Sequence, residues 1–580
     1  MKPKTSIIIP TYNSKIGITA KNEYDFAHSD IFNSLSYDNI IGSFGSKEGA
    51  INYYKETLDS GFPRSAAFLM TKIIKESIAM NLKHEARQIV FEDLSMLSEN
   101  MMDTDVDILI TKIARPSNRK KIMFCSAQWL TGGVERVMSI LFNELKNDYE
   151  IYLITPYDER HSHIDLPDFV TSIKIDNELF VKHFDSLILS YALLLDIDVA
   201  IGVMNLFPKL LNFYNICKGT EIKTIASNHE YYFYPYKSPG QYGVVEKRLS
   251  AFAKCDAIIW PLNFNAALCG LYIENNYVIG NPNNSNFIGV RLKRSSEKIV
   301  LCVGRFNDYV KRIDRILECF SLVLKKVPDA KLILVGKYDN HAPIRANDRT
   351  TVNDLINKFA IPSENINFIG EVNNVQDYYS RANVLLLTSD SEGFGMVVNE
   401  AAQFGVPSVC NYIPGIEDLI NDGENGYITK QNDIRTMALK VSNILLNDKL
   451  RETLGTNAQR KVKAFDAKII GDKWRFLIHS LIEVKDENEL RKKLDSKLKY
   501  EIKDRQIFTE VLAKELNEIF YKSLENNVVR SGIKLILSKT ANIPNRLRAN
   551  IEYEGFFKTV TKIATRSYRI LWVQLQKIKE

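Results

Sequence analysis

Two glutamates, Glu392 and Glu400, lie eight positions apart around the turn Gly393-Phe394-Gly395. The apolar run 383–388 before them is typical of a buried parallel strand, and residues 396–404 after them have helical spacing. Ligands bind at such strand-to-helix turns in open α/β sheets, because glycine lets backbone amides approach a ligand and a helix N-terminus attracts phosphate. The block therefore predicts a phosphorylated ligand whose hydroxyl groups bind the two carboxylates.

Two cations are predicted at the same edge of that sheet. Arg305 follows a strand predicted over 299–304, and Lys311 lies six residues later at the start of the next helix. Arginine offers a fork of donors for phosphate oxygens, and lysine offers a compact charge. Together they could neutralise a diphosphate leaving group without a metal. An exposed Arg and Lys are usually solvated surface, so it is the nearby Glu-x7-Glu turn that favours binding.

An earlier part of the chain carries a second set of candidates. Gly132 and Gly133 follow a strand predicted over 121–125 and open a helix, so their backbone could approach a phosphate. His229 lies at the end of a strand predicted over 224–228 and could bind a substrate hydroxyl or assist a proton transfer. A Gly-Gly turn and a lone histidine are each more often structural, so this set is the weaker of the two.

Strands and helices alternate twice along the chain, which predicts an α/β protein with two parallel sheets. A first Rossmann-like domain is predicted over 119–284 and a second over 285–480, with their sheets facing a cleft. The predicted strands are 121–125, 152–155, 199–203, 224–228, 257–260 and 277–279, then 299–304, 332–335, 366–369, 384–387 and 408–410. The predicted helices include 134–145, 312–326, 352–359, 375–381, 396–404 and 433–446.

Helical extensions are predicted on both sides of these domains. Residues 1–118 have helical spacing from about residue 50, and residues 481–580 form an increasingly basic helical tail. Residues 526–580 contain eleven Lys and Arg against three Glu, so they carry +8 while the rest of the chain carries −2. The positive charge is a property of the tail, and general nucleic-acid binding is not expected.

Two interpretations of the last helix are open. Its apolar residues alternate with Lys and Arg beside Tyr568 and Trp572, which is typical of a helix that lies on an anionic membrane surface. The same pattern fits a solvated helix that packs an apolar stripe on the protein.

Composition and cysteine usage indicate an intracellular globular protein. The 580 residues are 45% hydrophobic and 25% charged, as in ordinary soluble proteins. The seven scattered cysteines form no C-x-x-C pair, which predicts reduced thiols rather than disulfides or a zinc site. No signal peptide or membrane-spanning helix is expected. The expected location is the cytoplasm, and the basic tail suggests a peripheral position at the inner face of the membrane.

Taken in order, these residues resemble the retaining glycosyltransferases of family 4 (glycosyl transferase group 1), which have the GT-B fold. The resemblance covers residues 121 to about 480, and no single motif carries it. One departure is Arg312 after Lys311, where the family often has glycine. The residues that carry the resemblance are Gly132-Gly133, His229, Asn281-Pro282, Arg305, Lys311, Gly336, Gly370 and the Glu392–Glu400 block.

The resemblance implies a role for each candidate in the second domain. Glu400 would bind the ribose hydroxyls of a nucleotide sugar. Arg305 and Lys311 would hold its diphosphate. Glu392, with the backbone of Gly393, Phe394 and Gly395, would hold the donor sugar and the diphosphate.

The remaining roles fall on other loops. The turn Glu371-Val372 would meet the base of the donor. Gly132 and Gly133 would approach the phosphate from the first domain, and His229 would line the sugar and acceptor side.

The implied enzyme is a metal-independent hexosyltransferase that transfers a sugar with retention of configuration. Its acceptor would be a glycan or a lipid-linked molecule, in surface polysaccharide or glycoconjugate synthesis. No cofactor is implied, because the nucleotide sugar is a substrate. The residues nearest the reacting atoms would be Glu392, His229, Arg305 and Lys311.

Two other functions compete with this one. A glycoside hydrolase would use Glu392 and Glu400 as acid and base, but it has no diphosphate for Arg305 and Lys311 to hold. A catalytically inert GT-B scaffold would use the helical N-terminus as a partner site, although the intact site residues argue against it.

The first residues resemble a different class. Residues 4–13 look like the opening strand of the inverting family 2 glycosyltransferases, which have the GT-A fold and need an Asp-x-Asp metal site after an apolar strand. Asp103 and Asp105 have that spacing, but residues 98–102 are a poor strand. We therefore predict no working GT-A domain, and 4–13 is interpreted as a remnant of one or a chance match.

Overall fold

The computed structural model describes residues 7–8, 19–20, 46–59, 61, 63–80, 82–89, 97, 103–129, 132–156, 165–203, 205, 207–232, 248, 250–271, 273–283, 297–306, 309–338, 350–502, 508, 510–512 and 514–515. The chain divides into two compact units, Met1–Phe508 and Thr509–Glu580. All elements named below belong to the first unit. The predicted membrane-surface segment 526–580 lies outside the described residues.

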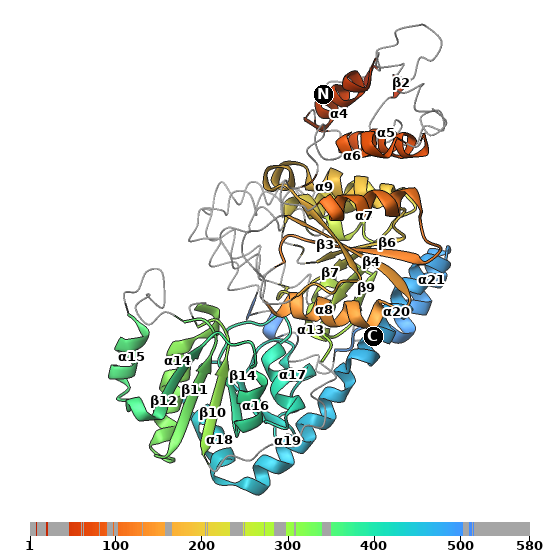
Figure 1. Cartoon of the computed structure of the whole chain (residues 1–580). Coiled ribbons are helices and arrows are strands. Elements are labelled where there is room, and N and C mark those ends of the chain that lie inside the picture. Colours follow the sequence, from red (N-terminus) through yellow and green to blue (C-terminus); the bar gives the residue numbers. More distant parts are fainter. Residues whose placement is uncertain are drawn as a thin grey trace, which may run out of the picture. The chain divides into compact units, whose positions relative to one another are not determined.

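Seven parallel strands form the first sheet, in the order β5-β4-β3-β6-β7-β8-β9 (Figure 1). Six of them confirm predicted strands. The sequence does not predict β5 (Val170–Ile175), an edge strand with three buried residues and no continuous apolar run. The other strands are β3 Lys120–Ser126, β4 Tyr149–Pro156, β6 Val199–Val203, β7 Lys223–Ser227, β8 Ala257–Trp260 and β9 Asn276–Val278.

Six parallel strands form the second sheet, in the order β12-β11-β10-β13-β14-β15, which is the order of a Rossmann sheet. Five confirm predicted strands. The sequence does not predict β15 (Gly426–Thr429), because it has four residues and begins with glycine. The other strands are β10 Lys298–Val303, β11 Ala330–Val335, β12 Ile366–Gly370, β13 Val384–Leu387 and β14 Ser408–Asn411.

The strand order reverses between β3 and β6 in the first sheet and between β10 and β13 in the second. Ligands bind outside the carboxyl ends of the strands at such reversals. Arg305 and Lys311 follow β10, and the Glu392 turn follows β13. The second sheet therefore places both predicted groups at its reversal point, on neighbouring strands.

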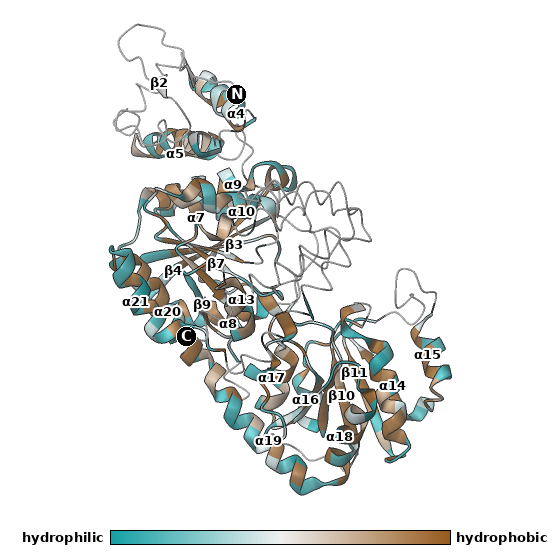
Figure 2. Ribbon diagram, turned by 180° about the vertical axis from the view of Figure 1, so that it is seen from behind, coloured by the Kyte–Doolittle hydropathy of each residue, from teal (hydrophilic) through white to brown (hydrophobic). Residues whose placement is uncertain are grey.

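Helices cover both faces of the second sheet, so its strands are buried on each side. Val300 of β10 packs with α14 and α18, while its neighbour Leu301 packs with α16 and α17. Figure 2 shows β10 and β11 in the brown of hydrophobic residues. The six helices predicted within the two domains are found, with ends that differ by at most two residues. These helices are α14 Ile313–Leu324, α15 Val352–Lys358, α16 Gln376–Arg381, α17 Met396–Gln403, α18 Ile434–Leu446 and, in the first domain, α8 Gly133–Leu145.

A helix from the end of the second segment completes the core of the first domain. Trp474 of α20 (Ala467–Glu483) packs in one cluster with Phe124 of β3 and Met138 of α8. The predicted domain limits 119–284 and 285–480 stay predictions, and the packing shows that α20 shares its core with the first sheet. The other described α-helices that follow β3 are α9 Asn177–Leu194, α10 Pro208–Cys217, α13 Asn263–Cys269, α19 Asp448–Val462 and α21 Glu487–Leu498.

The N-terminal extension is helical and contacts the first domain. Arg64 donates to the carbonyl of Lys218 at 2.6 Å, and the Thr71 hydroxyl donates to the carbonyl of Ser190 at 3.4 Å. Both donors lie on α5, and the helices are α4 Lys47–Asp59, α5 Pro63–Ala79, α6 Lys83–Gln88 and α7 Asp103–Ala114. Within the stretch that resembles a GT-A start, β1 (Ile7–Ile8) pairs antiparallel with β2 (Thr19–Ala20).

The Asp-x-Asp segment opens α7, so it lies in a helix rather than after a strand. All seven cysteines are buried and unpaired. In the part of the chain that the structure describes, no helix is long and apolar enough to cross a membrane.

We expect Trp474→Ala to lower the free energy of unfolding by about 3–5 kcal/mol, because it removes a large buried side chain from the shared core. Trp474 is 4% exposed. The control is Ile469→Ala on the same helix, since Ile469 is 44% exposed. Denaturant unfolding followed by circular dichroism measures both. Equal small losses would mean that α20 does not contribute to the first core.

Candidate functional site

The turn after β13 leads directly into the N-terminus of α17. Gly395 caps this helix with a φ of +90°, in the left-handed region that favours glycine. Met396, the first residue of α17, lies near the start of α8, because a Cβ on Gly133 would be 3.7 Å from Met396 Cγ. The N-termini of α8 and α17 therefore converge. Helix N-termini carry partial positive charge and unpaired N–H groups, so two together favour an anion.

Lys311 and Glu392 are brought together as the sequence predicts. Lys311 Nζ lies 2.7 Å from Glu392 Oε1, and both side chains are mostly buried. The lysine stem runs over Gly304, where an added Cβ would be 3.4 Å from Lys311 Cδ. Arg305 follows Gly304 and is exposed at the end of β10. A cation and a carboxylate thus lie together at the reversal point of the second sheet.

The contacts of Arg312 explain why arginine is tolerated at a position where the family often has glycine. Its φ of +54° is left-handed, the conformation in which glycine carries no penalty and other residues lose about 1–2 kcal/mol. Its guanidinium lies 2.7 Å from Asp314 and 3.2 Å from Asp390, and Arg315 also binds Asp390 at 2.6 Å. The Thr388 hydroxyl donates to the carbonyls of Lys311 and Arg312. These contacts offset the backbone penalty and fix the loop that carries Lys311.

Both oxygens of the Glu400 carboxylate are bound by protein groups. Arg136 of α8 lies 2.7 Å from Oε1, and the Tyr379 hydroxyl of α16 lies 2.8 Å from Oε2. The carboxylate and burial both raise the pKa of Tyr379, burial more strongly, so this hydroxyl stays a donor. Arg136 comes from the first domain, so the contact joins the two Rossmann-like domains.

Gly393 has a structural role that the sequence does not predict. A Cβ at this position would lie 1.8 Å from the carbonyl oxygen of His229. No side chain fits in that gap, because both neighbouring groups are backbone. The backbone of Gly393 therefore packs against the first domain, and this contact is separate from any contact with a ligand.

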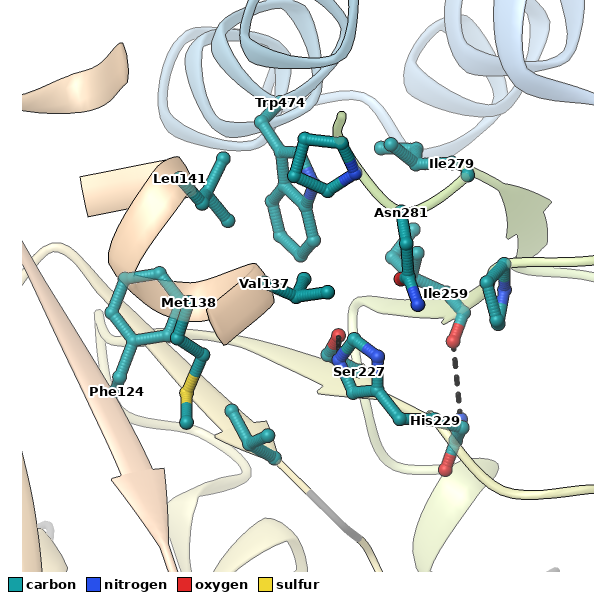
Figure 3. A pocket seen from close by; sticks show the side chains of 15 residues that line it. Phe124, Val137, Met138, Leu141, Ser227, His229, Ile259, Ile279, Asn281 and Trp474 are labelled. Atoms are coloured by element: carbon teal, nitrogen blue, oxygen red, sulfur yellow. Dashed lines mark hydrogen bonds between the residues drawn. The ribbon is translucent and has the colours of Figure 1, made fainter. Parts of the chain in front are cut away.

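The side chain of His229 points into a small apolar cavity of the first domain (Figure 3). The cavity has a volume of about 10 Å³, which is about the room that one water molecule needs. His229 Nε2 lies 3.1 Å from the Ser227 hydroxyl, and Asn281 lies beside the ring. Burial lowers the pKa of His229 to about 4, and a hydrogen bond with Asn281 opposes this only in part. The imidazole is therefore neutral at neutral pH.

A buried ion pair holds the backbone of His229 in place. Arg248 is 4% exposed and binds Glu230 Oε1, and Glu230 Oε2 accepts the backbone N–H of His229 at 3.0 Å. The guanidinium also lies over the rings of Phe252 and Trp260. Breaking such a pair leaves a buried charge without its partner, which usually costs several kcal/mol. The turn that meets Gly393 is thus rigidly supported.

Gly132, Glu371 and Val372 complete the predicted set. Gly132 caps α8 in an extended conformation. Glu371 and Val372 follow β12, which is separated from β13 by β11 and β10. Three strand spacings correspond to about 14 Å, so the turn lies well away from Glu392 along the sheet edge.

A second pocket, with a volume of about 360 Å³, lies between α13 and the loop after β14. Four carboxylates line it, and its described lining contains no Lys or Arg. Such a surface repels a diphosphate, so the converging helix N-termini are the better anion site. The carboxylates are Glu417, Asp418, Asp422 and Glu501.

Residues 284–461 match the protein family described as glycosyl transferases group 1. This segment is a group 1 glycosyltransferase domain. The predicted family resemblance is confirmed, and the matched segment includes β10 to β15 with Arg305, Lys311, Glu392 and Glu400.

The chain is similar to bacterial glycosyltransferases. It is 26% identical over 230 residues to an uncharacterised glycosyltransferase of Haemophilus influenzae, covering 39% of this chain and 62% of that protein. It is 24% identical over 365 residues to a Campylobacter jejuni protein named as an α-1,4-N-acetyl-D-galactosaminyltransferase of a diphosphoundecaprenol-linked glycan, covering 62% of this chain and 98% of that one.

Solved structures confirm the GT-B fold. Sucrose-phosphate synthase of Thermosynechococcus elongatus superposes with a TM-score of 0.53 at 19% identity, over 63% of this chain and 99% of that one. HepE of Anabaena, solved in complex with UDP, superposes with a TM-score of 0.50 at 16% identity, over 62% of this chain and all of that one. The predicted pair of Rossmann-like domains is therefore confirmed.

The structure places three residues at this site that the sequence does not predict, namely Arg136, Tyr379 and Arg248. Arg136 lies in the first turn of α8, and this placement near the Gly-Gly turn is the one signal that could have indicated it. Tyr379 and Arg248 give no such signal, because each acts through a partner far away in sequence or on another element. The predicted roles of the named site residues stay predictions.

We expect Gly393→Ala to destabilise the protein by about 1–3 kcal/mol, because the new methyl group overlaps the His229 carbonyl. The control is Gly133→Ala, where the methyl group would have ordinary contacts. Thermal unfolding and limited proteolysis compare the two. If Gly393→Ala is no less stable than the control, the close interdomain contact is wrong.

We expect His229 to make the protein less stable as the pH falls. In the unfolded chain His229 is protonated below about pH 6.5, whereas in the folded chain it stays neutral down to about pH 4. The free energy of unfolding therefore falls as the pH is lowered between these values. The loss amounts to about 3 kcal/mol below pH 4. Urea unfolding at pH 7, 5.5 and 4 should show a smaller fall for His229→Gln than for wild type. His479→Gln is the exposed control, and an unchanged pH dependence in His229→Gln would contradict the assignment.

Proposed function

We propose that this chain is a retaining, metal-independent glycosyltransferase that uses a nucleotide sugar as donor. Its acceptor is a glycan or a lipid-linked molecule in surface polysaccharide or glycoconjugate synthesis. The reaction takes place in the cytoplasm. Attachment of residues 526–580 to an anionic membrane surface belongs to the proposal and rests on the sequence alone.

The observation that carries the proposal is the convergence of two helix N-termini beside a mostly buried lysine. Met396 of α17 and Gly133 of α8 lie at the meeting point, and Lys311 lies on the preceding loop of the same sheet edge. N–H groups and a cation together match the oxygens of a diphosphate. A neutral sugar or an isolated peptide would leave these groups without a partner.

The same groups support loss of the diphosphate during the reaction. Negative charge grows on the leaving oxygen as its bond to the sugar breaks, and donors already in place stabilise that charge without reorganising. Lys311 would exchange Glu392 for a phosphate oxygen. Glu392 would then be available to a hydroxyl of the donor sugar.

Retention follows if the acceptor attacks from the side that the diphosphate leaves. The bond between the anomeric carbon and the phosphate oxygen breaks, and the bond to the acceptor oxygen forms. The acceptor proton passes to the departing phosphate, so no protein base has to take it. His229 is neutral and would contribute a hydrogen bond or its backbone position rather than a charge.

The comparisons support the choice of substrates. The Campylobacter relative is named for a lipid-linked glycan acceptor, and its match to this chain extends over nearly its whole length. HepE was solved with UDP, which makes uridine diphosphate the first donor nucleotide to test. The base itself would lie toward the turn at Glu371 and Val372.

The contacts of the two glutamates favour transfer over hydrolysis. A glycosidase needs one protonated and one ionised carboxyl group across the scissile bond. Here Glu392 pairs with Lys311, and Glu400 pairs with Arg136. Each carboxylate is therefore held in an ion pair with a cation, and a glycosidase has no diphosphate for such a cation to bind.

We expect Lys311→Ala to weaken donor binding by about 1.5–3 kcal/mol, because a charge-assisted contact with the diphosphate is lost. Lys298→Ala is the control, since Lys298 lies on β10 and pairs with Asp329 on the surface at 3.0 Å. Calorimetry with a panel of UDP, GDP and ADP sugars measures both. Equal affinities would refute the phosphate site, and no stabilisation by any donor at millimolar concentration would favour an inert scaffold.

The stereochemistry tests the remaining part of the proposal. Proton NMR of the product should show the anomeric configuration of the donor, and activity should persist in EDTA. An inverted product or a loss of activity in EDTA would contradict the mechanism. Sugar release from a glycan without any nucleotide would identify a hydrolase instead.

A further inference from the structure

We propose that Arg136 is a positioning residue that, with Tyr379, orients Glu400 to bind a vicinal diol of the donor nucleotide. This inference rests on the proposed function, because the diol is the ribose of a nucleotide sugar. It assigns a role in donor recognition to a residue of the first domain.

The first step is a count of hydrogen-bond sites on Glu400. An ionised carboxylate has two oxygens and about four lone-pair sites. Arg136 uses one site on Oε1, and Tyr379 uses one site on Oε2. One acceptor site is left on each oxygen, and these two neighbouring sites match two neighbouring hydroxyl donors. Each protein partner therefore fixes one oxygen without blocking it.

The second step concerns the unequal rigidity of the two partners. Tyr379 is 1% exposed, and its ring stacks on Phe404 with a centroid distance of 5.8 Å. Its hydroxyl is therefore fixed within the second domain. The Arg136 side chain is 45% exposed and reaches Glu400 from α8. Tyr379 alone leaves the carboxylate free to rotate about its hydrogen bond, and Arg136 removes that freedom.

The third step links recognition to the contact between the domains. Arg136 lies three residues after Gly133, where an added Cβ would be 3.7 Å from the side chain of Met396, the first residue of α17. Glu400 lies one turn into α17. The carboxylate is thus fully oriented only while the N-termini of α8 and α17 lie together. The same approach that forms the anion site also prepares the diol site.

An ordinary surface ion pair is the competing explanation, and such pairs contribute little to stability. The Glu400 side chain, however, is only 15% exposed, and its second oxygen is held by a buried tyrosine. An ion pair that served only the contact between the domains would not influence which nucleotide binds. Discrimination between ligands that differ by one hydroxyl therefore separates the two explanations.

The experiment compares the binding of UDP and 2′-deoxyuridine 5′-diphosphate by calorimetry. Wild type should prefer UDP by about tenfold or more, since one charge-assisted hydrogen bond is at stake. Glu400→Gln should lose most of this preference. Arg136→Gln and Tyr379→Phe should reduce it to about threefold or less, and Arg136→Lys should restore part of it.

The matched control is Arg381→Gln, on the same helix as Tyr379. Arg381 pairs with Glu297 at 3.2 Å, and both side chains are about half exposed. The control should keep the wild-type preference. Thermal unfolding of every variant checks that the fold is intact.

Each outcome decides the matter. If Arg136→Gln keeps the full preference while Glu400→Gln loses it, Arg136 is only an ion pair between the domains and the inference fails alone. If UDP does not bind, the same comparison is made with GDP and ADP and their 2′-deoxy forms. If no nucleoside diphosphate binds the wild type, the proposed function fails as well.

Discussion

The site depends on one close contact between the two Rossmann-like domains. The carbonyl of His229 occupies the space that a side chain on Gly393 would need. This backbone contact brings the loop after β7 against the turn after β13, and it brings the N-termini of α8 and α17 together. The buried pair of Arg248 and Glu230 supports one side of the contact. The charged groups, hydrogen-bond donors and acceptors of the site lie together because these two backbone segments are in contact.

The charges at this contact neutralise one another. Lys311 pairs with Glu392 within the second domain, and Arg136 pairs with Glu400 across the domains. Partly buried charges are costly unless they are paired, so these ion pairs offset the cost of burying the four groups. A donor that carries phosphates and hydroxyls offers a partner to each cation and to each carboxylate. Its binding therefore exchanges partners rather than leaving any charge alone.

Local patterns in the sequence predict the frame of the fold and much of the site. Central strands such as β10 and β13 are buried on both faces, so their apolar runs are unmistakable, whereas the edge strand β5 has no such run. Lys311 and Glu392 are predicted together because parallel strands end at one sheet edge. Arg136 escapes prediction because its partner is 264 residues away and on another domain. The contact of Gly393 is not predicted for the same reason, because its partner lies in the other domain and a glycine in a turn does not show which backbone segment approaches it.

The position of α20 has a consequence for folding. Its apolar stripe completes the core of the first sheet, although the first sheet itself ends at β9, nearly two hundred residues earlier in the chain. The matched group 1 segment ends at residue 461, just before this helix. During synthesis the first domain therefore lacks one layer of its core until the second domain has been made. Because closing a contact across a long intervening segment costs loop-closure entropy, we expect the core of the first domain to be completed late, when α20 docks on it.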